Sequence, residues 1–85
     1  PFYGLHTRLD QLAALHAARL DQVVSACSEP RTVADLVPTL FPRALDRHQL
    51  GFAVGETLSH LVRAANAGRL RRRDRDDGIW LFERA

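Results

Sequence analysis

The side chains best suited to chemistry lie on one face of a predicted helix. This face combines an amide, an aromatic ring, a carboxylate, an imidazole and a guanidinium, contributed by Gln49, Phe52, Glu56, His60 and Arg63. At 100° per residue these positions fall within about 80° of one another. Glu56 and His60 are four positions apart, so the carboxylate can accept the imidazole proton and orient the ring. In an enzyme such a pair supports a catalytic group, but a structural hydrogen bond is the commoner arrangement and the one we expect here.

No other pattern in the sequence carries catalytic or metal-binding chemistry. The histidines His6, His16, His48 and His60 have no i, i+4 metal spacing, and HExxH, GxSxG and phosphate-binding glycine motifs are absent. His16 and Cys27 fall on an apolar stripe, so we expect both to be buried and inert. We therefore predict that this chain itself contains no catalytic residue, no metal ligand and no cofactor.

The first helix that positions these residues is expected at 7–27, after an aromatic lead-in at 1–6 with the sequence PFYGLH. Thr7 is its expected N-cap. Pro30 ends it by driving the preceding residue out of helical geometry. Its apolar positions recur at helical spacing and form one stripe, made of Leu9, Leu12, Ala13, His16, Leu20, Val23, Val24 and Cys27.

Two further helices follow. The second is expected at 33–41, because Thr32 and Asp35 form a variant capping box. The third is expected at 46–67, with an Asp as its first residue and N-cap and with Gly68 as its stop signal. Its apolar stripe is expected to face the core and consists of Leu50, Ala53, Val54, Thr57, Leu58, Leu61, Ala64 and Ala65.

A short hairpin is expected at 69–83. Asp77 and Gly78 supply the turn, since Gly accepts positive φ without steric cost. Trp80 and Phe82 alternate along the second strand and are expected to share one face. Residues 1–85 therefore form one mainly helical α+β domain, in which three helices precede a two-stranded β-hairpin in a winged-helix-like layout.

Composition bounds the class of protein. The 85 residues carry a net charge of +2 and a single Cys, so no internal disulfide can form and a cytoplasmic location is expected. No apolar run approaches the roughly 20 residues of a membrane span. The sequence contains no Met and begins with Pro1, so we expect it to be part of a longer polypeptide.

Winged helices often bind DNA, but the charges of the third helix do not favour that function. Residues 46–68 contain two arginines and two carboxylates, so the net charge of this segment is zero. A helix that binds DNA needs cations for the phosphates. The hairpin is more basic, with five arginines against three aspartates between residues 69 and 77. Interleaved carboxylates indicate a self-paired ribbon. A DNA-binding domain of a transcriptional regulator stays the alternative to a protein-facing accessory domain.

Gly51 and Gly55 favour a protein partner. Each costs about 1 kcal/mol relative to Ala inside a helix, and they lie four positions apart. We expect another helix or a loop to approach the backbone closely at this point, or the helix to tolerate both because its packing outweighs propensity. A homodimer through the face that carries Phe52 is a further possibility.

Three segments resemble a known family: PFYGLH at the start, LDRHQLGFAVGETLSHL at 45–61, and AGRLRRR with DGIWLF in the hairpin. They are similar to the C-terminal winged-helix-like domain of metallo-β-lactamase-fold hydrolases, the glyoxalase II-like group. The likeness covers nearly the whole chain. One departure is the sequence VRAA at 62–65, which is smaller and less aromatic than the family pattern.

The resemblance implies a catalytic domain that precedes this one and holds zinc ions. It implies that Phe2, Tyr3, Gly4, Leu5 and His6 cross from the metal site into this domain, and that the first and third helices pack beside the mouth of the active site. The parent protein is then expected to hydrolyse thioesters, esters or related acyl groups. This domain contributes shape and specificity through residues 2–6 and through Gln49, Phe52, Glu56 and His60.

Overall fold

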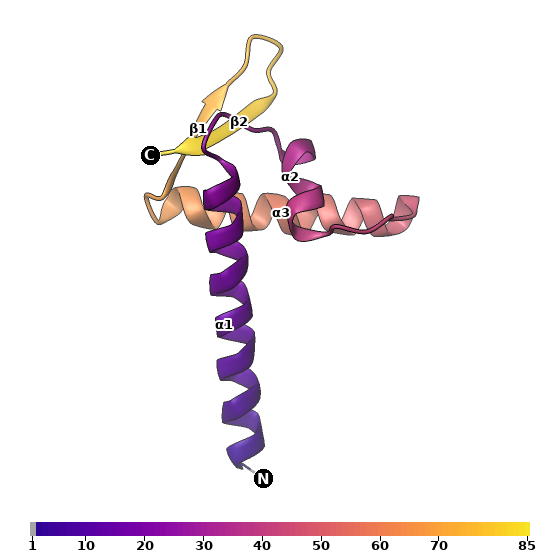
Figure 1. The fold of residues 1–85 in the computed structure, drawn as a ribbon, viewed down its shortest axis with the longest axis vertical. Helices are drawn as coiled ribbons and strands as arrows, with labels where there is room; N and C mark the ends of the chain where they lie inside the picture. Colours follow the sequence, from indigo (N-terminus) through magenta and orange to yellow (C-terminus); the bar gives the residue numbers. More distant parts are fainter. Residues whose placement is uncertain (1) are drawn as a thin grey trace.

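Three helices and one hairpin form the molecule. The computed structural model describes the backbone of residues 2–85 and the side chains of residues 11–85. The elements follow in the order α1 (Phe2–Ala26), α2 (Val33–Leu40), α3 (Arg47–Asn66), β1 (Leu70–Asp74) and β2 (Trp80–Arg84) (Figure 1). The predicted mainly helical α+β fold with a C-terminal hairpin is confirmed.

The core lies where the C-terminal part of α1 meets the other elements. In Figure 1, α1 runs across α3 near its own C-terminal end, while its N-terminal part extends away from the rest of the chain. The buried cluster draws on every element and consists of Val23, Cys27, Leu36, Leu40, Leu61, Ala64, Leu70 and Phe82. Burial of this apolar surface is the main stabilising term for so small a domain.

Two capping boxes set the starts of α2 and α3. The Thr32 hydroxyl accepts from the Asp35 N–H, and the Asp35 carboxylate accepts from the Thr32 N–H. Asp46 and Gln49 repeat this exchange at the start of α3, with distances of 2.7 and 3.1 Å. Each box satisfies backbone donors that a helix start leaves unpaired. The predicted caps of both helices are confirmed, and α2 ends one residue before the predicted limit.

The start of α1 differs from the prediction. The helix begins at Phe2, so the segment 2–6 is helical and Thr7 lies inside the helix instead of capping it. The aromatic composition of PFYGLH suggested an irregular lead-in. Residues 2–6 contain no proline, however, and a single glycine at position 4 weakens a helix without breaking it.

The hairpin pairs Leu70 with Arg84 and Asp74 with Trp80 in antiparallel register. Its loop is closed by Arg75, whose carbonyl accepts from the Gly78 N–H at 2.8 Å, and Gly78 has φ +85°. The predicted turn is therefore a three-residue loop, and the hairpin ends at Arg84, one residue beyond its predicted limit. Strand β2 is paired on both edges, because its Phe82 exchanges two backbone hydrogen bonds with Arg31.

A glycine inside α3 and the glycine that follows its C-cap offer a matched test of backbone conformation. Gly68 follows the helix with φ +77°, and the Arg69 N–H reaches back to the Ala64 carbonyl at 2.9 Å. Gly55 lies inside the helix, and a Cβ added at either glycine meets no atom within 4 Å. We expect Gly68→Ala to lower the free energy of unfolding by about 1–2 kcal/mol, and Gly55→Ala to raise it by about 0.5–1 kcal/mol. Urea unfolding measures both, and a shift of the same sign for the two variants would contradict the assignment.

Candidate docking surface

The N-terminal part of α1 leaves a long uncharged surface in solvent. Residues 11–18, QLAALHAA, are all exposed, and none of them is charged. Leu12 and Leu15, three positions apart on the helix, are 45% and 46% exposed. Large apolar groups that lie in water side by side mark a site of contact with other protein.

Among the residues predicted to form the outer surface of α3, the aromatic one, Phe52, is exposed. Phe52 is 66% exposed, the highest exposure among the large hydrophobic side chains that the structure describes. Gln49 is exposed too, but its side-chain oxygen already accepts from the Asp46 N–H at 3.1 Å. Glu56 is half-buried. The predicted residues Phe2, Tyr3, Gly4, Leu5 and His6 lie outside the residues whose side chains the structure describes.

The sequence predicts His60 on the outer face of α3, but the structure buries it, with an exposed fraction of 3%. The buried side of α3 consists of Ala53, Thr57, His60, Leu61 and Ala64. It is rotated by roughly 40° from the apolar stripe read from the sequence. As a result, Val54, which was expected in the core, is exposed. Leu50 is exposed too, although its direction falls within the buried side, because it lies near the N-terminal end of α3. The rotation arises because α1 crosses α3 on the side of His60.

Glu56 and His60 are hydrogen-bonded, but the predicted contact between their side chains is wrong, because the acceptor is a backbone atom of Glu56. His60 Nδ1 lies 2.7 Å from the backbone carbonyl oxygen of Glu56. A carbonyl oxygen only accepts, so Nδ1 carries the proton and donates it. The other ring nitrogen, Nε2, is buried and has no hydrogen-bond partner within the described residues. A buried unpaired polar atom costs about 1–3 kcal/mol and calls for an explanation.

His16 also differs from its prediction, because it is exposed and not part of the core. Its ring meets that of His60 edge to face, with centroids 6.0 Å apart and an angle of 87° between the planes. The apolar stripe of α1 was correctly located in sequence, since Val23 and Cys27 are buried. Its N-terminal part continues beyond α3, and there the described residues 11–18 are exposed.

The close neighbour expected at Gly51 and Gly55 is not found among the residues that the structure describes. Both glycines are exposed, and an added Cβ would meet no heavy atom within 4 Å. On the same side of α3, Val54 and Val62 are also exposed.

The arginines of the hairpin are engaged inside the domain. Arg69 pairs with Asp21 at 2.8 Å, and Arg75 pairs with Asp77 at 2.7 Å. Arg72 lies over the Trp80 ring, 4.2 Å from its centroid. The remaining contacts are those of Arg71 and Arg73 with Glu83, and of Arg84 with the carbonyl oxygens of Val24 and Ser25. These arginine side chains remain largely exposed, and exposed ion pairs are weak, so the paired carboxylates lower the net charge of the hairpin without burying its cations.

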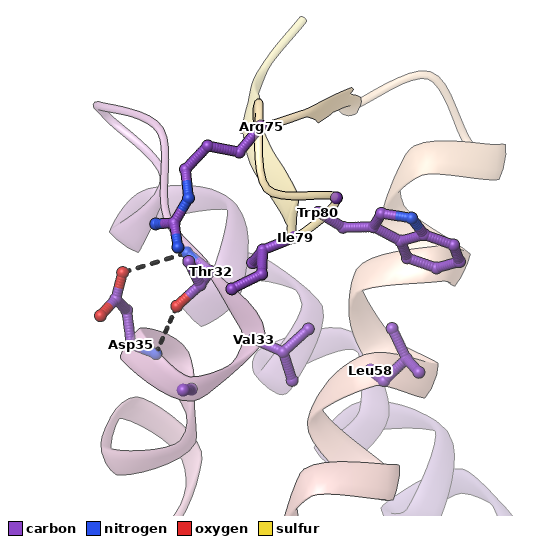
Figure 2. A pocket seen from close by; sticks show the side chains of 9 residues that line it. Thr32, Val33, Asp35, Leu58, Arg75, Ile79 and Trp80 are labelled. Atoms are coloured by element: carbon purple, nitrogen blue, oxygen red, sulfur yellow. Dashed lines mark hydrogen bonds between the residues drawn. The ribbon is translucent and has the colours of Figure 1, made fainter.

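A groove of about 590 Å³ opens between the start of α2, the middle of α3 and the hairpin loop. Figure 2 shows Val33, Leu58, Ile79 and Trp80 along its apolar part, and Thr32 and Asp35 joined by their capping hydrogen bonds. Those bonds from Thr32 hold the pKa of Asp35 below its ordinary value. The hydrogen bond from Arg75 lowers the pKa of Asp77, at the neighbouring loop, to about 2. The groove's charged groups therefore serve the fold, and they offer no general base near neutral pH.

Residues 11–85 offer neither a metal site nor a reactive thiol. In that range His, Cys, Asp and Glu side chains do not gather in any group of three that could hold a metal ion. Cys27 is free and buried, and its burial raises the pKa of the thiol, which makes it a poor nucleophile. The helices that the structure describes are too short or too polar to cross a membrane.

Comparison with known proteins places these features in context. Residues 20–85 match the family described as "Metallo-beta-lactamase-like, C-terminal domain". The chain is also similar to the crystal structure of a beta-lactamase domain protein from Burkholderia ambifaria, with 46% sequence identity over 93% of this chain and a TM-score of 0.85. The match spans only 24% of the length of that solved chain. No curated protein matches the sequence.

Proposed function

Since this chain belongs to the metallo-beta-lactamase-like C-terminal domain family, we propose that it is the non-catalytic accessory domain of a zinc-dependent hydrolase. Its role is to pack on the catalytic domain that precedes it and to shape the substrate pocket there. The observation that carries this proposal is the uncharged, solvent-exposed part of α1 at residues 11–18. It lies on the N-terminal side of the domain, where the preceding domain joins.

Zinc belongs to that preceding domain and not to this one. The side chains of residues 11–85 do not form a ligand set for it, and a zinc site needs three or four such groups. Zinc supplies an activated water for hydrolysis of acyl substrates. This chain contributes apolar contacts instead. Phe52, together with the segment 2–6, is proposed to border the mouth of the pocket.

The parent protein is proposed to work in the cytoplasm. Cys27 is the only cysteine of the chain and is a free thiol, a state that a reducing compartment preserves. The substrate class that the family resemblance favours is a thioester, ester or related acyl compound.

Removing this domain from the full-length protein tests the proposed function. We expect the truncated protein to lose solubility, or to lose kcat/KM across a panel of acyl substrates, because the apolar contact surface of the catalytic domain is then exposed. The matched control is the full-length protein carrying Ile79→Ala in the hairpin, far from the free part of α1. Full solubility together with full kcat/KM on every substrate after truncation would refute the accessory role.

The alternative function, DNA binding, predicts a salt-dependent affinity for duplex DNA. Binding to duplex DNA must weaken steeply with salt, in proportion to the number of phosphates that the protein neutralises. Because the hairpin arginines already pair within the domain, we expect fluorescence anisotropy to show only weak binding. Nanomolar, strongly salt-dependent affinity for duplex DNA would favour the regulator instead.

A further inference from the structure

A second exposed apolar surface lies on the side of α3 that faces away from α1. It is formed by Val54 and Val62 of α3, which are each 39% exposed, and by Ile79 and Trp80 of the hairpin, which are 43% and 40% exposed. At 100° per residue, Val54 and Val62 lie about 120° and 160° from His60, whose ring meets α1. Exposed apolar groups that adjoin one another across two elements mark a contact with other protein. We call these four residues the α3–hairpin surface.

Trp80 joins the hairpin to the C-terminal half of α3. Its side chain borders the groove of about 590 Å³ together with Leu58 (Figure 2). It also borders a second groove, of about 320 Å³, together with Val62 and Arg72. The exposed indole ring therefore lies beside positions 58–62 of α3.

The N-terminal half of α3 is low on the same side, because two glycines lie there. Gly51 and Gly55 each point within about 20° of the direction of Val62. Both are exposed, and an added Cβ would meet no heavy atom within 4 Å among the described residues. Each glycine weakens the helix relative to alanine, and the contacts that the structure describes give neither of them a role. A ring from outside that packs against the bare backbone would give them one.

The low stretch and the ring lie at equal distances from the middle of α3. The helix extends from Arg47 to Asn66, so its midpoint falls between residues 56 and 57. The glycine pair is centred on position 53 and the ring on position 60, each about 5 Å from that midpoint at 1.5 Å per residue. A twofold axis at the midpoint would therefore place the ring of each copy over the glycines of the other. Such self-complementarity is what a twofold interface requires.

We infer that the α3–hairpin surface binds a second copy of this chain, with the two α3 helices antiparallel about a twofold axis near their midpoint. The preceding domain of the proposed function joins at the start of α1. Figure 1 shows that end of α1 and the hairpin at opposite ends of the longest dimension of the molecule, which is 53 Å. A separate chain is therefore the better occupant. The inference goes beyond the proposed function, because the accessory role needs no second copy.

The charges on this side of α3 also favour a second copy. Between residues 48 and 66, the positions that share this arc of about 100° are all uncharged: Gly51, Val54, Gly55, Leu58, Val62 and Ala65. Two identical surfaces can meet there without repulsion between like charges. An apolar centre without charges is typical of homodimer interfaces.

Sedimentation velocity of the full-length protein tests this dimer. Gly55→Leu and Val62→Asp alter the proposed interface, and Phe52→Asp is the control on the outer face of α3. Leucine is a better helix former than glycine, and the space beside Gly55 is open in a single copy, so Gly55→Leu keeps the fold. Circular dichroism of each variant confirms that the helices are retained.

We expect the unaltered protein and Phe52→Asp to sediment as dimers. We expect Gly55→Leu and Val62→Asp each to raise the Kd of the dimer by about tenfold to a hundredfold, because the first fills the space that the partner's ring needs and the second buries a carboxylate. A monomeric full-length protein at its highest soluble concentration would overturn the inference. A dimer that persists in both interface variants, or that only Phe52→Asp dissociates, would overturn it as well. None of these results bears on the accessory role, which the truncation tests separately.

Discussion

Replacing Phe82 with alanine is expected to lower the free energy of unfolding of this domain by about 3–5 kcal/mol. Phe82 is 1% exposed and is the largest fully buried side chain in the described part of the molecule. Its ring belongs to the cluster that joins all three helices to the hairpin. A domain of this length has a total stability of about 4–13 kcal/mol, so the substitution removes much of it.

Urea unfolding followed by circular dichroism measures this loss. The backbone of Phe82 also ties the hairpin to the connector at Arg31, but those two hydrogen bonds involve main-chain atoms and survive the substitution. Ile79→Ala is the matched control, because Ile79 is an exposed apolar residue just before the same strand. We expect the control to cost less than about 1 kcal/mol. Equal losses for the two variants would contradict the burial pattern described above.

Placing carboxylates on the proposed docking surface is expected to weaken interdomain packing by about 2–4 kcal/mol. The double variant Leu12→Asp with Phe52→Asp removes two large apolar side chains, each worth roughly 1.5–3 kcal/mol when fully buried. Both are already partly covered in this chain, with exposed fractions of 45% and 66%, so the combined effect lies below the sum. The new charges add a desolvation cost at any apolar contact.

Scanning calorimetry of the full-length protein and kcat/KM on acyl substrates measure this effect. We expect the single unfolding transition to separate into two and kcat/KM to fall. The same double variant of the 85-residue chain is the control, and its unfolding midpoint should change little because both positions face solvent there. A full-length double variant with an unaltered transition and unaltered activity would show that this surface is not used.

Local signals predicted most of the secondary structure. Both capping boxes depend on residues three positions apart, and such contacts form within one turn of helix. Gly68 and Gly78 have the positive φ that their positions at a helix end and in a hairpin loop require. The hairpin loop holds three residues, where the sequence predicted Asp77 and Gly78 as the turn. Only the start of α1 differs substantially from the prediction, because the aromatic segment 2–6 is helical and not an irregular lead-in.

The family could also be inferred from the sequence, because its segments are contiguous. The motif at 45–61 and the hairpin sequence lie within residues 20–85, which match the metallo-beta-lactamase-like C-terminal domain. The placement of individual site residues was less successful. His60 was assigned to the surface and is buried, whereas His16 was assigned to the core and is exposed.

The sequence by itself determined where the helices and strands lie, because caps, glycines and apolar periodicity act over a few neighbouring residues. Only the tertiary structure decided which side of α3 faces the core and how much of α1 is covered. Helical periodicity gives the direction of a stripe but not the angle or position at which another helix crosses it. The crossing of α1 over α3 buries His60 and leaves residues 11–18 exposed, and the proposed packing on the preceding domain rests on that exposed part.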